Sequence, residues 1–183
     1  LDEGPLDIAN HYFDLTFDLT AGTVSRLQRT GDDFETNFLS TPGWMLGDIE
    51  MTYRLGAGAW AQANTYDSDD NRNVAFSMDG DRMTIDITYP TPSGEPQGIR
   101  DFDFSQQWIL DENTLALRVS LTNTTANPLE LGDLAIPLPF NTDYDGNTES
   151  IQKKRVLRHG FFSGHASHSY WTRVNGQPDY LVM

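Results

Sequence analysis

The sequence predicts an all-β protein built as an antiparallel β-sandwich. Its short segments alternate apolar and polar residues with a period of two, as half-buried strands do. Turn residues separate these segments about every 8–12 residues, a spacing typical of sandwiches and barrels. No segment of useful length shows the 3.6-residue period of an amphipathic helix.

The first expected hairpin lies near the N-terminus. Residues 11–19 alternate in polarity, and a turn at Ala21-Gly22 leads into residues 23–29, whose apolar residues Val24 and Leu27 make them the expected hairpin partner. The apolar side chains that share one face of the first strand are Phe13, Leu15, Phe17 and Leu19.

The remaining strands follow the same alternation. They are expected at residues 48–55, 74–78, 82–89, 99–110 and 114–122, with a last one that runs to Met183. The Asp79-Gly80 pair gives the strongest hairpin signal in the chain. Residues 129–140 carry Pro137 and Pro139, which predict an edge strand or a strand that leaves the sheet.

Composition limits the classes of protein and partner. A chain of 183 residues suits one well-cored domain. With 27 acidic and 12 basic residues, its net charge of -15 repels phosphate backbones, so we expect no nucleic-acid partner. There is no cysteine, and no apolar run approaches the length of about 20 residues that a membrane helix needs.

The two ends of the sequence suggest a fragment. The chain begins at Leu1, and its last residues, Tyr180 to Met183, are apolar with no turn signal after them. We therefore expect residues 1–183 to form a single β-sandwich domain of a longer polypeptide that continues past Met183.

Residues 155–171 gather more groups able to hydrogen-bond, stack or titrate than any other stretch. They hold three of the 4 histidines and follow the basic pair Lys153-Lys154. This basic cluster favours an acidic sugar, although the acidic remainder argues against a strongly anionic one. The residues expected to contact carbohydrate here are Arg158, His159, His165, His168, Tyr170 and Trp171.

Metal binding is the alternative for this stretch. Imidazole is a good zinc ligand, and His165 and His168 are three residues apart. Positions three apart in a strand point to opposite faces, so the pair would converge only in a loop or helical turn.

Two further tryptophans are candidates for stacking on a sugar ring. Trp44 and Trp60 stand beside glycines in predicted loops, and core packing is the alternative for each. Trp108 lies in a strongly alternating strand, which predicts a core position.

A calcium site is possible where oxygen-bearing side chains alternate. The candidate ligands are Asp143, Asp145, Asn147 and Glu149. Lys154 stands where an EF-hand loop would have its bidentate glutamate, so this is no EF-hand. Residues 67–73 are similarly rich in oxygen, and a solvated turn is the alternative for both segments.

No catalytic motif emerges. The sequence has no nucleophile elbow, phosphate loop or zincin motif. Acidic pairs such as Asp48 with Glu50, and Asp101 with Asp103, are not distinguished from solvent-facing strand positions.

One long segment carries a resemblance to a known class of domain. In residues 115–140 a strand ends in Leu-Thr-Asn, and a short turn leads to an Ile-Pro-Leu-Pro edge. This pattern resembles the galactose-mutarotase-like supersandwich domains, which precede helical-barrel catalytic domains in bacterial and fungal glycoside hydrolases and polysaccharide lyases. Residues 159–164 and 178–183 look like a family of large, uncharacterised secreted proteins with that layout.

The resemblance implies a domain of a secreted or periplasmic polysaccharide-active protein, and since the sequence shows no catalytic motif, we expect a non-catalytic module. Such a module would bind a polysaccharide or oligosaccharide, or support a catalytic domain that follows in the same chain. The alternative is that the domain forms part of a hydrolase or lyase active site, with His159 or His165 as general acid or base. A third reading is a purely structural or oligomer-forming sandwich.

Overall fold

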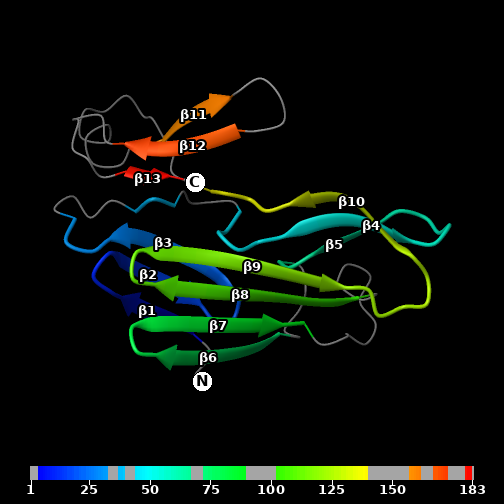
Figure 1. Ribbon diagram of the computed structural model, residues 1–183, viewed down its shortest axis with the longest axis horizontal. Coiled ribbons are helices and arrows are strands. Elements are labelled where there is room, and N and C mark those ends of the chain that lie inside the picture. Colours follow the sequence, from blue (N-terminus) through cyan, green and yellow to red (C-terminus); the bar gives the residue numbers. More distant parts are fainter. Residues whose placement is uncertain are drawn as a thin grey trace.

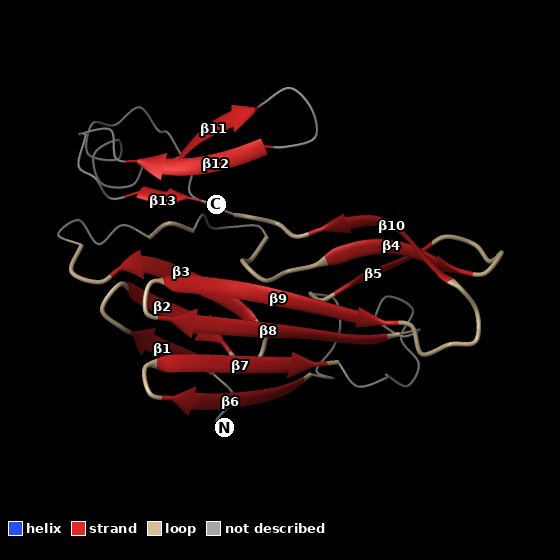
Figure 2. Cartoon of the chain, in the orientation of Figure 1, coloured by secondary structure: helices blue, strands red, loops and turns tan. Residues whose placement is uncertain are grey.

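The computed structural model describes residues 4–32, 37–39, 44–66, 72–89 and 102–139, and the backbone of residues 157–161, 167–172 and 180–182. These residues form strands, turns and loops (Figure 2). The described part contains no helix that could cross a membrane. The predicted all-β class is confirmed.

The strands pair antiparallel throughout the described residues. The sheets have the orders β1-β2-β3, β10-β4-β5, β6-β7-β8-β9 and β11-β12-β13. In chain order the strands are β1 (Pro5–Ala9), β2 (Phe13–Asp18), β3 (Thr23–Arg29), β4 (Glu50–Leu55), β5 (Ala61–Asn64), β6 (Asn73–Asp79), β7 (Arg82–Thr88), β8 (Asp103–Asp111), β9 (Thr114–Thr122), β10 (Leu129–Ala135), β11 (Leu157–Phe161), β12 (Ser167–Thr172) and β13 (Tyr180–Val182).

Two of these sheets form a sandwich, as predicted. In Figure 1 the β6–β9 sheet lies in front of the β1–β3 sheet. Trp108 of β8 packs edge-to-face on Phe17 of β2, with ring centroids 6.0 Å apart, and its indole N–H donates to the Gly22 carbonyl. Trp108 is only 2% exposed, so its predicted core position is confirmed. The side chains that fill this core include Leu15, Val24, Leu27, Met83, Ile85, Ile87, Phe104 and Leu110.

A β-bulge explains how β3 fits the core. The register runs from Leu15 opposite Leu27 to Phe17 opposite Val24, with an irregularity between these pairs. Val24 and Leu27 are three residues apart and would face opposite ways in a regular strand. The extra residue of the bulge turns both of them inward, and the predicted hairpin of residues 11–19 with 23–29 is confirmed as β2 and β3.

The β10-β4-β5 sheet continues the core on one side. Met51 and Tyr53 of β4 are buried, and Tyr53 meets Phe102 with ring centroids 5.1 Å apart. β10 pairs with β4 alone among the described strands, so it is an edge strand, as its prolines predicted. The segments before β4 and after β5 form much of the site described below.

The sheet of β11, β12 and β13 contains much of the stretch that the sequence singled out. Its backbone register places Arg158 opposite Tyr170, Gly160 opposite His168, and Leu157 opposite Trp171. The predicted last strand is confirmed as β13, which pairs with β12. His165 lies outside the described residues.

Candidate functional site

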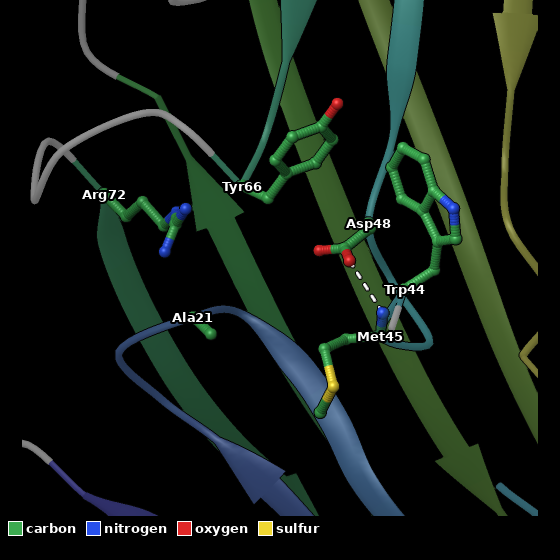
Figure 3. A pocket seen from close by; sticks show the side chains of 6 residues that line it. All are labelled: Ala21, Trp44, Met45, Asp48, Tyr66 and Arg72. Carbon is green, nitrogen blue, oxygen red and sulfur yellow. Dashed lines mark hydrogen bonds between the residues drawn. The ribbon is translucent and has the colours of Figure 1, made fainter. Parts of the chain in front are cut away.

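A pocket opens where four separate segments of the chain meet (Figure 3). These are the β2–β3 turn, residues 44–48 before β4, the end of β5 and the start of β6. Its volume is about 530 Å³, within the range of ligand sites in proteins. It is lined by Ala21, Trp44, Met45, Asp48, Tyr66 and Arg72.

Two aromatic side chains form the exposed walls of the pocket. Trp44 is 46% exposed and Tyr66 is 41% exposed. Their rings meet nearly at a right angle, with centroids 5.0 Å apart. The Tyr66 hydroxyl donates a 2.7 Å hydrogen bond to Glu50 Oε2, which fixes the orientation of the phenol. The pocket therefore offers flat apolar surface that is already held in place.

A buried carboxylate forms the polar part of the pocket. Asp48 is 6% exposed, and its Oδ2 accepts a 2.7 Å hydrogen bond from the Met45 N–H. Burial raises the pKa of Asp48, while the Met45 hydrogen bond and the positive charge of Arg72 lower it, and burial has the larger effect. Figure 3 shows the other carboxylate oxygen pointing toward the space between Tyr66 and Arg72. That oxygen is available to accept hydrogen bonds from a ligand.

Arg72 links the segments around the pocket. Its Nη1 donates to the Thr20 carbonyl at 2.6 Å, and its Nη2 donates to the Thr65 carbonyl. The guanidinium also lies 5.8 Å from the centroid of the Tyr89 ring. Arg72 thus ties the β2–β3 turn and the end of β5 to the start of β6, and so positions the walls.

A buried polar network supports the segment that carries Asp48. Gln106 Nε2 donates a 2.7 Å hydrogen bond to the Gly47 carbonyl, and the Tyr89 hydroxyl donates to Gln106 Oε1 at 2.6 Å. Burial of the phenol raises the pKa of Tyr89 to about 12, so its hydroxyl stays protonated and keeps donating. Gly47, the residue before Asp48, is therefore fixed by a hydrogen bond from a buried side chain of the core.

The two loop tryptophans have different surroundings. Trp44 is exposed and lines the pocket, and its stacking role stays a prediction. Trp60 is also exposed, but it lies outside the pocket lining, and the Arg54 guanidinium sits over its ring at 4.9 Å from the centroid. Arg54 in turn pairs with Glu130, so this indole belongs to a surface cluster on β4 and β10.

The other predicted ligand residues cannot be placed in this pocket. Only the backbone is described for the sugar candidates in β11 and β12, which are Arg158, His159, His168, Tyr170 and Trp171. The calcium candidates Asp143, Asp145, Asn147 and Glu149 lie outside the described residues. Within the described residues, no group of three or more His, Asp or Glu side chains could hold a metal ion.

The structure corrects one sequence interpretation and adds two residues. Asp48 was not distinguished from solvent-facing strand positions, but it precedes β4 and is buried against the core. Arg72 lies in residues 67–73, which were interpreted as a possible calcium loop or a solvated turn, and Tyr66 comes directly before them. Arg72 is the one basic residue within 67–73, and that isolated charge was the available signal of a structural role.

A comparison with models of protein families identifies the family of this chain. Residues 18–183 match the model of a family described as "Family of unknown function (DUF5695)". No curated protein and no solved structure gave a significant match. The family match covers almost the whole chain, including every residue that lines the pocket. The chain therefore belongs to the family of unknown function DUF5695.

Proposed function

We propose that this protein is a non-catalytic, carbohydrate-binding β-sandwich module of a secreted polysaccharide-active protein, and that a sugar binds in the pocket of Trp44 and Tyr66. The observation that carries the proposal is the pair of exposed aromatic walls beside the buried carboxylate of Asp48. We place the site here because the side chains of four separate segments converge on one pocket.

The chemistry of the pocket suits a pyranose ring. One face of such a ring is made of C–H groups, which pack on a flat aromatic side chain, and its rim carries hydroxyls. Trp44 and Tyr66 supply the apolar surface, and the free oxygen of Asp48 accepts from a hydroxyl. Hydrogen bonds to a carboxylate are among the stronger ones, so this oxygen would orient the sugar.

The pocket is also pre-organised. Glu50 holds the Tyr66 hydroxyl, Arg72 holds two carbonyls of the surrounding segments, and Gln106 holds Gly47. A site whose walls are already ordered loses little conformational entropy when a ligand binds. A pocket with ordered walls therefore suits a ligand-binding site better than an exposed surface without such order does.

The wider context of the proposal rests on the resemblance of residues 115–140 to galactose-mutarotase-like supersandwich domains. Domains of that type stand before helical-barrel catalytic domains in polysaccharide-active proteins. The proposal therefore includes a polysaccharide or oligosaccharide as ligand, a catalytic domain in the same chain as partner, and a secreted or periplasmic location.

Affinity electrophoresis of the 183-residue chain against neutral and acidic polysaccharides tests the proposal. We expect one or more glycans to retard the protein, and Trp44→Ala to abolish the retardation. Tyr12→Ala is the matched control, because Tyr12 is also an exposed aromatic residue but lies between β1 and β2, outside the pocket lining. Retardation lost in Trp171→Ala but kept in Trp44→Ala would move the site to β12. No retardation on any gel would refute carbohydrate binding.

A second candidate is a part in catalysis, and the buried Asp48 favours it. A carboxyl whose pKa is raised by burial inside a pocket can act as a general acid. This role would make the domain part of a hydrolase or lyase active site. Release of reducing ends or unsaturated sugars by the isolated chain, abolished by Asp48→Asn, would support it over simple binding.

A further inference from the structure

We infer that the pocket selects uncharged sugar units and rejects uronic acids, with Asp48 as the specificity-determining residue. The inference rests on the proposed carbohydrate binding and adds the class of ligand. It departs from the acidic sugar that the basic cluster at residues 153–158 suggested.

The first step concerns hydrogen-bonding capacity. Within the described part of the chain, the Asp48 carboxylate accepts a hydrogen bond from the Met45 N–H through Oδ2. Its other oxygen points into the pocket (Figure 3). A sugar hydroxyl can donate to that oxygen, whereas an ionised uronate carboxylate has only acceptors to offer. A uronate unit can donate to Asp48 only from its remaining hydroxyls, whereas an uncharged unit can also donate from its primary hydroxyl.

The second step concerns charge. Asp48 is buried, and the protein around it weakens the repulsion between two charges less than water does. An anionic group beside Asp48 would therefore be repelled more strongly than in water. Glu50 adds a second carboxylate behind the Tyr66 wall. The protein as a whole carries a net charge of -15, which also disfavours an anionic polymer on approach.

Arg72 is the cation that could offset this repulsion, and its geometry limits what it can do. Nη1 and Nη2 donate to the carbonyls of Thr20 and Thr65, which hold the guanidinium against the backbone. The two carbonyls fix the orientation of the guanidinium, so a uronate could pair only with N–H groups that make no bond to the protein, in the direction that this orientation leaves them. Among the described residues around the pocket, the Arg72 guanidinium, held by two backbone carbonyls, thus stands against the carboxylates of Asp48 and Glu50.

The test compares each glycan with its own oxidised form. A soluble β-glucan, an α-glucan and a galactomannan are each titrated in a neutral form and after oxidation of primary hydroxyls to carboxylates, with binding measured by calorimetry at neutral pH. We expect at least one neutral glycan to bind, and its oxidised form to bind at least tenfold more weakly. This preference of the unmodified protein is measured without any variant, so it does not depend on a variant that folds.

Asp48→Asn then tests the residue. The amide keeps the size of the side chain and removes its charge, so the neutral-to-oxidised affinity ratio should fall at least threefold. Asp81→Asn is the control, because Asp81 is an exposed acid at the β6–β7 turn, at the opposite end of β6 from Arg72. It makes the same change in net charge and should leave the ratio unaltered.

The outcomes separate the two proposals. Oxidised glycans that bind as tightly as neutral ones would overturn the selectivity and leave carbohydrate binding standing. An equal fall in the ratio for Asp48→Asn and Asp81→Asn would assign the selectivity to net charge and overturn the role of Asp48. If none of the six polysaccharides binds, the proposed function fails and the inference fails with it.

Discussion

The indole of Trp44 and the phenol of Tyr66 stand edge to face, with their planes at 82° and their centroids 5.0 Å apart. These residues flank the β4–β5 hairpin, one before β4 and the other after β5. The antiparallel pairing of Glu50 with Asn64 brings the two ends of the hairpin together. The pairing of two strands, rather than proximity in sequence, therefore creates the aromatic corner.

Removal of one hydroxyl tests the importance of this orientation. Tyr66→Phe keeps the ring but removes the hydrogen bond to Glu50. We expect glycan affinity to fall by roughly 0.5–1.5 kcal/mol, the usual net contribution of one hydrogen bond. Isothermal titration measures the change, with Glu50→Gln as the partner variant. An affinity of Tyr66→Phe equal to that of the unmodified protein would mean that the phenol needs no anchor.

The close approach of Gly47 to Trp108 predicts a large effect on stability. Gly47 has a φ of 115°, and a Cβ at this position would lie 2.7 Å from the indole. Strained backbone and overpacking each cost about 1–3 kcal/mol, so we expect Gly47→Ala to lower the free energy of unfolding by at least about 2 kcal/mol.

Gly80→Ala is the matched control for this experiment. Gly80 also has a positive φ, 61°, but a Cβ there would meet no atom within 4 Å. It should cost only the strain of a left-handed residue, about 1–2 kcal/mol. Urea denaturation measures both variants, and equal losses would show that contact with Trp108 adds nothing.

The alternation of apolar and polar residues predicted a strand best where one face of the strand is buried and a tight turn connects it to the next strand. Residues 23–29 and 114–122 agree with β3 and β9 at both ends. β1, β5, β11 and β12 were not predicted, and for β1 and β5 the sequence shows a physical reason. β1 is short and lies at the edge of its sheet, and β5 reads Ala-Gln-Ala-Asn, which has no β-branched or aromatic residue to signal a strand.

The site was harder to predict because its parts are distant in sequence. Trp44 was a candidate because a large aromatic residue in a glycine-containing loop has little core to enter. Asp48 is buried by the packing of its own segment against β8, which local alternation does not encode. Arg72 positions the walls of the pocket through hydrogen bonds to the carbonyls of Thr20 and Thr65. These bonds join segments that are distant in sequence, so the role of Arg72 could be recognised only from the folded structure.

The polar network under the pocket gives a third prediction. Tyr89→Phe removes the hydroxyl that donates to Gln106 Oε1, which leaves a buried acceptor without that donor. An unsatisfied buried group costs about 1–3 kcal/mol, so the free energy of unfolding should fall by that amount. The double variant with Gln106→Leu removes both partners and should lose less than the sum of the single variants. Additive losses would show that the two side chains act independently.

The two loop tryptophans should respond differently to truncation. Trp60→Ala removes an indole that lies under the Arg54 guanidinium and beside Gly132, outside the pocket lining. We expect glycan affinity to stay within about twofold of the unmodified protein, a difference of less than about 0.5 kcal/mol. Trp44→Ala should abolish measurable binding in the same titration. A large loss with Trp60→Ala would extend the sugar site onto β10.

The buried carboxylate also predicts how stability depends on pH. Burial raises the pKa of Asp48 above its ordinary value of 3.8, so the folded protein binds this proton more tightly than the unfolded chain does. The stabilisation that the folded protein gains from binding this proton is therefore complete below pH 3.8. It is lost as the pH rises through the raised pKa of Asp48. Above the raised value, the ionised Asp48 makes the fold less stable than an uncharged isostere would.

Asp48→Asn should accordingly be more stable than the unmodified protein at pH 7, and the difference should shrink as the pH falls below the raised pKa. The lowered pKa values of Asp7 and Glu130, which accept from Thr16 and Arg54, make both proteins less stable in acid. Because both proteins share these groups, their effects cancel in the difference. Thermal unfolding from pH 7 down to pH 3 measures it, with Asp81→Asn as the control for net charge. A difference that grows on acidification would mean that Arg72 and Met45 stabilise the ionised form more than burial disfavours it.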